Sequence, residues 1–252
     1  PARVTMSEAS RVHLQPAYVL HHRPYRDTSR ILELFTRDFG RVTVFARAAR
    51  GGRNKSGSLM SVLQPFNRVL VSWSGRGEAG QLTAGDFDGG GSIMAHDQLG
   101  FVYYVNVLLL KLFARHDAHP DVFGFYAATI EALKASGEPL KALRVFEKRL
   151  LEALGYGLVL DIDAVSQEPV IAERMYHYRL EQGAVKALDV AEGSLVFRGS
   201  SLLSLAREEL VSTAALADAR RLLRAALERC LDGRELKSRQ VLLALRRATP
   251  SG

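Results

Sequence analysis

The hydrophobic pattern of this chain changes period about a third of the way along, and that change limits the folds available to it. In the first third, apolar residues alternate with polar ones in short runs, which is the pattern of half-buried β-strands. Residues 41–46 (RVTVFA) show it most clearly, with Val42 and Val44 on one face and Phe45 on the other. Farther along, apolar residues recur at helical spacing. The pattern predicts an α+β protein of more than one domain.

Five short strands separated by turn residues are expected in the first part. We expect them over residues 17–22, 29–36, 41–46, 66–73 and 81–87. Five strands in fewer than 90 residues indicate a small closed barrel, and the OB-fold is the most common barrel of that size. We therefore predict a disordered tail over residues 1–14 and an OB-fold over residues 15–86. The polar, glycine-rich segment 85–92 (GDFDGGGS) is the expected boundary.

The second part, residues 93–252, is predicted to be an α-helical domain with a small irregular β insertion at about residues 157–198. Pro120 and Pro139 stand where helices are expected to begin, and Gly155 stands where one is expected to end. The helices are expected over residues 99–115, 122–135, 140–154, 201–209, 213–231 and 238–247. The short strands of the insertion are expected over residues 175–179, 184–188 and 194–197.

The positive charge of the chain is concentrated in the first part. Residues 1–85 hold 13 basic and 5 acidic side chains, whereas the remainder holds 21 and 22. Between Gly40 and Gly77 there are seven basic residues and no acidic one. A stretch of one sign repels itself, and a polyanion such as a nucleic acid would relieve that repulsion. The alternative is a basic, solvated surface without a partner.

Several classes of protein are not indicated. No apolar run reaches the roughly 18 residues needed to cross a bilayer, and residues 1–16 lack the apolar core of a signal peptide. Cys230 is the only cysteine, which excludes an internal disulfide framework or a cysteine-based zinc site. We expect a cytoplasmic protein with no membrane partner and no cofactor.

Motifs that resemble catalytic or cofactor sites have simpler interpretations. Residues 75–80 (GRGEAG) match the dinucleotide fingerprint, but the next segment is strand-like, so a hairpin turn is expected. The seven histidines lack the spacing of a metal site. Two carboxylate pairs could hold Mg²⁺ for phosphodiester cleavage, although such pairs more often make turns and cap helices. These pairs are Asp86 with Asp88 and Asp161 with Asp163.

Basic and aromatic residues are interleaved in the barrel region, as in proteins that bind single-stranded nucleic acid. The rings are expected either to stack bases or to fill the barrel, and Phe45 could do either. The aromatic residues are Phe39, Phe45, Phe66 and Trp73. The residues predicted to contact nucleic acid are Arg41, Arg47, Arg50, Arg53, Lys55, Arg68 and Arg76.

Segments along most of the chain resemble one known family, the bacterial recombination mediator RecO. No single segment is decisive, but their order and spacing extend over about 220 residues. The segments are residues 17–29 (AYVLHHRPYRDTS), 34–36 (LFT), 40–42 (GRV), 46–51 (ARAARG), 63–66 (LQPF), 74–78 (SGRGE), 143–147 (LRVFE), 154–156 (LGY) and 236–239 (LKSR).

The resemblance implies a DNA repair protein that is not an enzyme. It implies an OB-fold and a helical domain that together bind single- and double-stranded DNA and anneal complementary strands. It also implies action with RecR to load the RecA recombinase onto DNA coated by single-strand-binding protein. Lys237 and Arg239, in the last matching segment, are added to the predicted DNA contacts.

The resemblance bears on a zinc module and on a peptide-binding pocket. Some members carry a four-cysteine zinc module after the LGY segment, but residues 158–186 contain no cysteine, so zinc is not carried over. Zinc-free relatives bind the acidic C-terminal tail of the single-strand-binding protein in the helical domain, and Arg144 is the matching position. Arg144 could pair with a terminal carboxylate while Leu143, Phe146 and Leu150 hold an aromatic ring. The alternative is an i,i+3 ion pair between Arg144 and Glu147.

Two other functions remain open at this point. An OB-fold with this charge could bind RNA, which binding to matched RNA and DNA strands would reveal. A Mg²⁺-dependent nuclease using the aspartate pairs would cleave labelled DNA.

Overall fold

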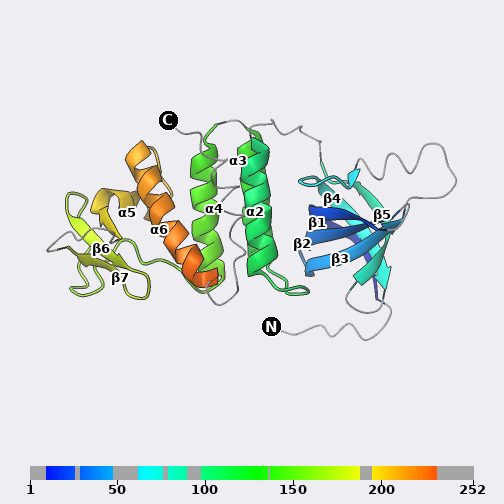
Figure 1. Ribbon diagram of the computed structural model, residues 1–252, viewed down its shortest axis with the longest axis horizontal. Helices are drawn as coiled ribbons and strands as arrows, with labels where there is room; N and C mark the ends of the chain where they lie inside the picture. Colours follow the sequence, from blue (N-terminus) through cyan, green and yellow to red (C-terminus); the bar gives the residue numbers. More distant parts are fainter. Residues whose placement is uncertain are drawn as a thin grey trace. The chain divides into compact units, whose positions relative to one another are not determined.

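A computed structural model of the chain describes residues 10–25, 29–47, 62–75, 79–89, 98–135, 137–187 and 195–231. The expected helix over residues 238–247 lies outside these ranges, as do residues 1–9 of the expected tail. The chain divides into two compact units, residues 1–124 and 125–252. Figure 1 gives the labels of the helices and strands.

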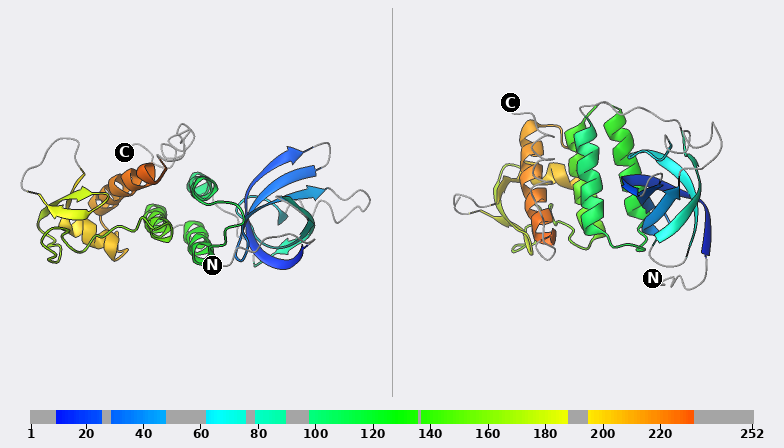
Figure 2. Two further views of the ribbon diagram at one scale, coloured as in Figure 1. Left: turned by 90° about the horizontal axis from the view of Figure 1, so that it is seen from below. Right: turned by 45° about the vertical axis from the view of Figure 1, so that its right-hand side comes forward.

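Five strands close into a barrel in the first unit, drawn in blue and cyan in Figures 1 and 2. The strand order is β1-β2-β3-β5-β4, and β4 pairs with β1 to complete the circle. Every pair is antiparallel except β3 with β5, which is parallel. The barrel is OB-like, as predicted. The strands are β1 (Ser10–Tyr25), β2 (Ser29–Thr36), β3 (Gly40–Arg47), β4 (Arg68–Gly75) and β5 (Ala79–Phe87).

The alternation in the sequence decides which side chains fill the barrel. Val42 and Val44 point inward and are buried, while Thr43 between them is only half-buried. Trp73 also lies inside, against Gly80, where a Cβ atom would stand 2.6 Å from the indole Cδ1 atom. Only glycine leaves room for that ring. Residues 76–78 lie outside the described ranges, but Gly75 ends β4 and Gly80 belongs to β5, and these two strands are antiparallel. The segment after the motif is therefore a strand, as expected, and not the helix that a dinucleotide-binding turn requires.

The first strand begins earlier than the sequence indicated. We predicted a tail over residues 1–14, but β1 starts at Ser10 and its first residues pair with the end of β4. A register shift between Val12 and Gln15 interrupts that pairing, and Leu14 there has a φ of 46°. Its backbone N–H donates to Ser72 Oγ at 3.0 Å. The bulge breaks the alternation, which explains why the pattern did not reveal this part of the strand.

Helix α2 (Leu99–Leu112) and the residues after it belong to the barrel unit. Asn106 Nδ2 donates to the Leu20 carbonyl at 2.8 Å. The ring of Phe123 lies 5.5 Å from that of Tyr18, measured between centroids. Gly40, at φ 64°, is so close to Asp117 that a Cβ atom would overlap its carbonyl oxygen. The first compact unit thus extends to Gly124 and includes α2.

The second unit contains helices and a small sheet. Helix α4 packs against α6, and α6 packs against α5. The sheet has the order β7-β6-β8 and forms the predicted irregular insertion. None of the helices in the described ranges is long and apolar enough to cross a bilayer. The elements are α3 (Pro120–Lys134, which begins in the first unit), α4 (Pro139–Ala153), β6 (Met175–Arg179), β7 (Gly183–Lys186), β8 (Val196–Arg198), α5 (Gly199–Ala206) and α6 (Thr213–Leu231).

Candidate nucleic-acid interface and peptide groove

The outer face of strands β1, β2 and β3 has a covered end and an exposed end. At the covered end Phe35 is fully buried, with its ring 5.7 Å from that of Phe123 between centroids. Toward the other end of the same face lie Phe45, which is half-buried, and Tyr25, which is exposed. The alternation of the strands gives all these residues one outward orientation. Only the exposed end can meet a ligand.

A network of charged side chains occupies the middle of this face. Arg41 Nη2 donates to Glu33 Oε1 at 2.7 Å, and Arg115 Nε donates to the same oxygen at 3.2 Å. Arg41 Nη1 also donates to the carbonyls of Leu110 and Phe113, at 2.6 and 2.7 Å, where α2 ends. Arg41 was predicted to contact DNA, but its guanidinium is engaged inside the unit. We assign it a structural role, because it ties β3 to the C-terminus of α2.

The network keeps Glu33 ionised. Burial alone would raise the pKa of Glu33, but hydrogen bonds from Arg115, Arg41 and Thr43 outweigh it and hold the pKa below its usual range. The ion pair with Arg41 is shielded, since both side chains are only 11% exposed. Glu33, the one carboxylate on the described part of this face, is therefore neutralised by its neighbours.

The exposed end of the face combines aromatic rings with cations. The rings of Tyr25 and Phe45 lie 5.3 Å apart between centroids, inclined at 50°. Arg23 and Arg47 are exposed on either side of them. Ile31 lies opposite both Arg23 and Phe45 in the strand register. We call these five residues the Tyr25–Phe45 patch. Sequence reasoning predicted Arg47 and considered Phe45, but it missed Tyr25 and Arg23.

The remaining predicted DNA contacts fall into two groups. Arg68 is exposed at the start of β4, and its Nε atom donates to Asp88 Oδ2 at 2.7 Å. An exposed pair of this kind contributes little stability, so a phosphate could replace the carboxylate. The other group lies outside the described residues and consists of Arg50, Arg53, Lys55, Arg76, Lys237 and Arg239. Their roles stay predictions.

Most of the other aromatic residues considered for base stacking belong to the core. Trp73 is 4% exposed, and Phe39 packs edge-on against it at 5.5 Å between centroids. Phe66 is half-buried in the segment before β4 and has a φ of 75°. Phe45 is thus the one of the four that lies on the outer face of the barrel together with a second ring.

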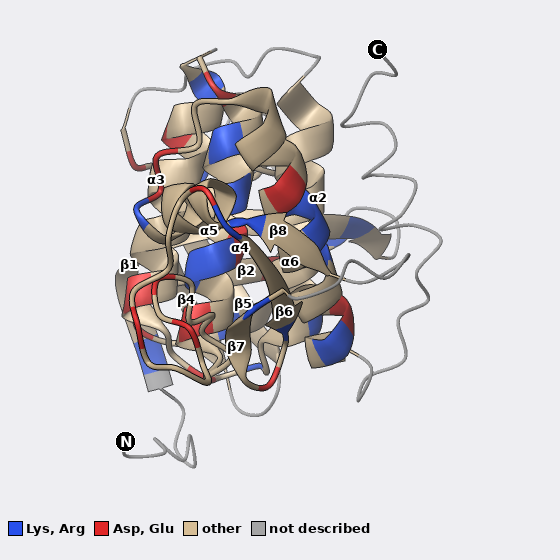
Figure 3. Ribbon diagram, turned by 90° about the vertical axis from the view of Figure 1, so that its left-hand side faces the viewer, with Lys and Arg blue, Asp and Glu red and all other residues tan. Residues whose placement is uncertain are grey.

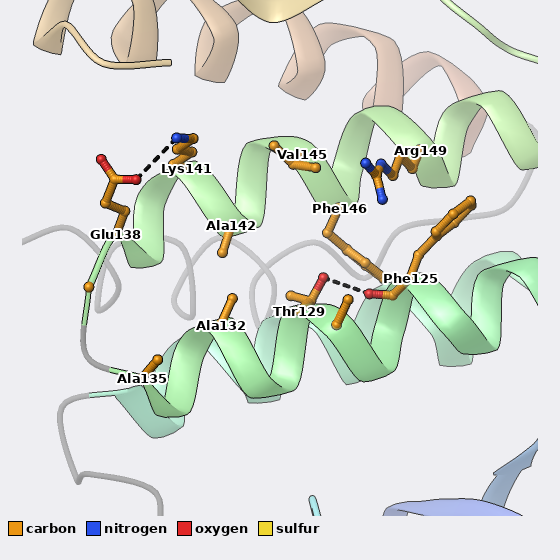
Figure 4. A pocket seen from close by; sticks show the side chains of 12 residues that line it. Phe125, Thr129, Ala132, Ala135, Glu138, Lys141, Ala142, Val145, Phe146 and Arg149 are labelled. Atoms are coloured by element: carbon orange, nitrogen blue, oxygen red, sulfur yellow. Dashed lines mark hydrogen bonds and ion pairs between the residues drawn. The ribbon is translucent and has the colours of Figure 1, made fainter. Parts of the chain in front are cut away.

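The second unit contains a groove between α3 and α4, shown in Figure 4. Its volume is about 400 Å³. Alanines, Val145 and the rings of Phe125 and Phe146 give it an apolar lining. Arg149 lies over the Phe125 ring, 5.1 Å from its centroid, at one end of the groove. Lys141 lies at the other end, in an ion pair of 3.1 Å with Glu138.

The residues predicted to bind an acidic tail are arranged differently from the prediction. Arg144 is 4% exposed and forms an ion pair of 3.1 Å with Glu147, which was the alternative interpretation. Leu143 and Leu150 are buried and do not line the groove, whereas Phe146 does. The cations that the groove offers are Lys141 and Arg149, which the sequence analysis missed. Their eight-residue spacing corresponds to about two turns of α4. The spacing alone does not reveal that this face of α4 borders a groove, because the groove also depends on the position of α3.

Glu208 joins two cations of α4. Arg149 Nη2 donates to Glu208 Oε2 at 2.6 Å, and Lys148 Nζ approaches Glu208 Oε1 at 3.2 Å. The hydrogen bond to Glu208 raises the pKa of Arg149, so it stays charged at any working pH. Figure 3 shows both basic (blue) and acidic (red) residues on the helices. This agrees with the near-neutral count of charges beyond residue 85.

Asp163, from one of the two aspartate pairs, is engaged by backbone groups. Asp163 accepts backbone N–H groups from Val165 and Ser166 on Oδ1 and from Lys186 on Oδ2, all at 2.9–3.0 Å. These bonds, that from Ser166 foremost, lower the pKa of Asp163. Within the described ranges, no group of three or more His, Cys, Asp or Glu side chains could hold a metal ion. Asp163 thus organises the insertion by joining its loop to β7.

The fold and these surfaces define a class, an OB-barrel protein with a helical second unit. Comparison with known proteins identifies the family. The model of the Recombination protein O N-terminal domain matches residues 9–87, and that of the C-terminal domain matches residues 96–240. The chain therefore belongs to the RecO family of DNA repair proteins.

Relatives named DNA repair protein RecO match nearly the whole chain. The one from Methylococcus capsulatus is 43% identical over 242 residues, which is 96% of this chain and 97% of the relative. The one from Alkalilimnicola ehrlichii is 44% identical over 247 residues, 96% of each chain. The one from Nitrosococcus oceani is 41% identical over 237 residues, 94% of this chain and 95% of the relative.

Proposed function

We propose that this protein is a non-enzymatic recombination mediator that binds single- and double-stranded DNA and anneals complementary strands. The observation that carries this proposal is the exposed, cation-flanked end of the barrel. Arg47 there leads directly into the basic segment with Arg50, Arg53 and Lys55, in a region without an acidic residue between positions 40 and 77.

Annealing follows from charge neutralisation. Two complementary strands repel each other through their phosphates, and basic side chains that contact both reduce that repulsion. Contacts to phosphate leave the base edges able to pair. Such a protein accelerates annealing without forming or breaking a covalent bond, so we propose no catalytic residue. The engagement of Asp163 and Asp88 with other groups supports this reading over a nuclease.

The groove between α3 and α4 is proposed to dock the acidic, Phe-ended tail of the single-strand-binding protein. The terminal aromatic ring of the tail would enter the apolar groove. The carboxylates of the tail would be attracted by Lys141 and Arg149. The two cations stand two turns apart on α4, about 12 Å, which several residues of an extended peptide can span. We further propose that the protein acts with RecR to load RecA onto coated DNA.

A strand-annealing assay tests the proposal most directly. Complementary DNA strands are coated with single-strand-binding protein, and duplex formation is followed with and without this protein. We expect annealing to be accelerated, and we expect less acceleration when the coating protein lacks its C-terminal tail. No acceleration on coated or bare strands would refute the proposed function. Parallel binding to matched RNA would reveal whether RNA is the preferred ligand.

A further inference from the structure

The Tyr25–Phe45 patch has an unusual place in the barrel. At the covered end of the same strands, the outward-facing rings of Tyr18 and Phe35 are buried and contact Phe123 at the start of α3. Toward the other end, Tyr25 is 37% exposed and Phe45 is half-buried. Exposed rings that contact each other on a rigid sheet are typical of a binding surface. They are costly to leave in water without a ligand.

The strand register presents the two rings as a platform. Tyr25 pairs with Ser29 on β2, and Ser29 pairs with Arg47 on β3. Because Ser29 is small, the Tyr25 ring can reach across β2 toward Phe45, one register step away, and the two centroids lie 5.3 Å apart. The platform stands on paired strands, so its geometry is fixed before any ligand arrives.

The charges around the platform select the kind of ligand. Arg23 on β1 and Arg47 on β3 flank the rings, two strand spacings apart and two residues apart in register, or about 12 Å at the backbone. Neither forms an ion pair with an acidic residue in the described part of the chain. On the outward face of the described parts of β1, β2 and β3, Glu33 is the only acidic residue, and it is held by Arg41 and Arg115. A ligand with flat rings and a polyanionic backbone complements this surface.

We propose that the Tyr25–Phe45 patch stacks an unpaired base of single-stranded DNA, and that it gives the barrel its preference for single strands over duplex. The flat faces of bases in a duplex are already stacked on their neighbours, whereas those of a single strand are accessible. Arg23 and Arg47 contact the phosphates on either side of the stacked base. This inference rests on the DNA binding proposed above and adds the strand preference and the residues responsible.

The experiment compares the full chain with its Tyr25→Leu and Phe45→Leu variants. Affinity is measured by fluorescence anisotropy for a single-stranded oligonucleotide and for a duplex of the same length. We expect each variant to bind the single strand roughly tenfold more weakly, as for loss of one base stack, and the duplex almost as well as before. The salt dependence should be unchanged, because no cation is removed. Stacking on the rings should quench the fluorescence of a single strand that carries 2-aminopurine. We expect this quenching with the wild-type chain and not with the two variants.

Matched variants separate stacking from folding. Tyr25→Phe keeps the ring and should retain single-strand affinity, and Phe87→Leu removes another exposed ring of the barrel, 47% exposed, outside the patch. Unchanged affinity of both patch variants, or equal losses on single strand and duplex, would overturn the stacking proposal while leaving DNA binding in place. A wild-type chain that binds neither form of DNA would instead refute the proposed function.

Discussion

The barrel and the helical unit differ in how their arginine side chains are paired with acidic residues. On the described helices α4 and α6 of the helical unit, most basic side chains form ion pairs with nearby acids, as Arg144 does with Glu147 and Arg149 with Glu208. In the described part of the barrel, Arg23 and Arg47 have no acidic partner, although Arg41 on the same face does. Net charge therefore says less about a binding surface than the local balance of charges does. We expect DNA to bind where basic side chains have no acidic partners. We expect peptides to bind where a few cations border an apolar groove.

The largest expected effect comes from reversing the charges that adjoin the exposed end of the barrel. The triple variant R47E/R50E/R53E should bind single-stranded DNA roughly 100-fold more weakly at low salt, with a salt slope smaller by about two. The matched control R221E/R224E/R229E makes the same charge change on exposed positions of α6. Salt titrations of both variants test the contrast between units. Equal losses in the two variants would show that only the net charge matters.

Arg41 and Arg47 are two arginines of one strand for which we expect opposite consequences. Arg41→Met removes one of the partners of Glu33 and two hydrogen bonds to carbonyls at the end of α2, so the free energy of unfolding should fall by about 2 kcal/mol. Arg47→Met should leave the stability within about 0.5 kcal/mol and weaken DNA binding. Chemical denaturation and anisotropy on both variants give the comparison. If Arg41→Met weakened DNA binding without lowering the stability, Arg41 would have to be counted among the DNA contacts.

Lys141→Glu should weaken binding of an acidic, Phe-ended peptide to the α3–α4 groove about tenfold, because it places a negative charge at the mouth of the groove. Arg207→Glu, an exposed reversal elsewhere in the same unit, is the control and should bind normally. Anisotropy of a labelled peptide is the measurement. DNA affinity of both variants should stay near that of the wild type, since neither residue belongs to the barrel unit.

The smallest effect concerns pH. Because the folded-state pKa of Glu33 lies below its unfolded value, near 4.5, Glu33 stabilises the fold above that value and loses its contribution as the pH falls through the folded pKa. Glu33→Gln should thus be less stable than the wild type at pH 7, by about 1 kcal/mol. The difference should shrink in strongly acidic solution. Denaturation curves at pH 7 and in strongly acidic solution measure this stability difference. A difference that does not change with pH would contradict the conclusion that Glu33 is ionised in the folded protein.

The sequence predicted the barrel strands well because strand alternation is a local property, and the structure confirms the OB-like fold. Alternation also placed Arg41 and Phe45 correctly on the outward face. It could not indicate that the end of α2 covers Arg41 and leaves Phe45 accessible, because that depends on residues about 70 positions away. The helical site was harder for the same reason. The face of α4 that carries Arg144 and the face that carries Arg149 look alike until the neighbouring helices are known.

The attachment of α2 to the barrel has a consequence for fragments of this protein. The matched N-terminal domain ends at residue 87, but a fragment cut there lacks Asn106, Arg115 and Phe123. Tyr18 and Phe35 would then face solvent, and Glu33 would keep only part of its support. Such a fragment would expose an apolar strip and tend to aggregate. We expect the smallest fragment that folds on its own to extend to about Gly124, where the first compact unit ends. The folding unit that carries the proposed DNA contacts would then be larger than the barrel itself.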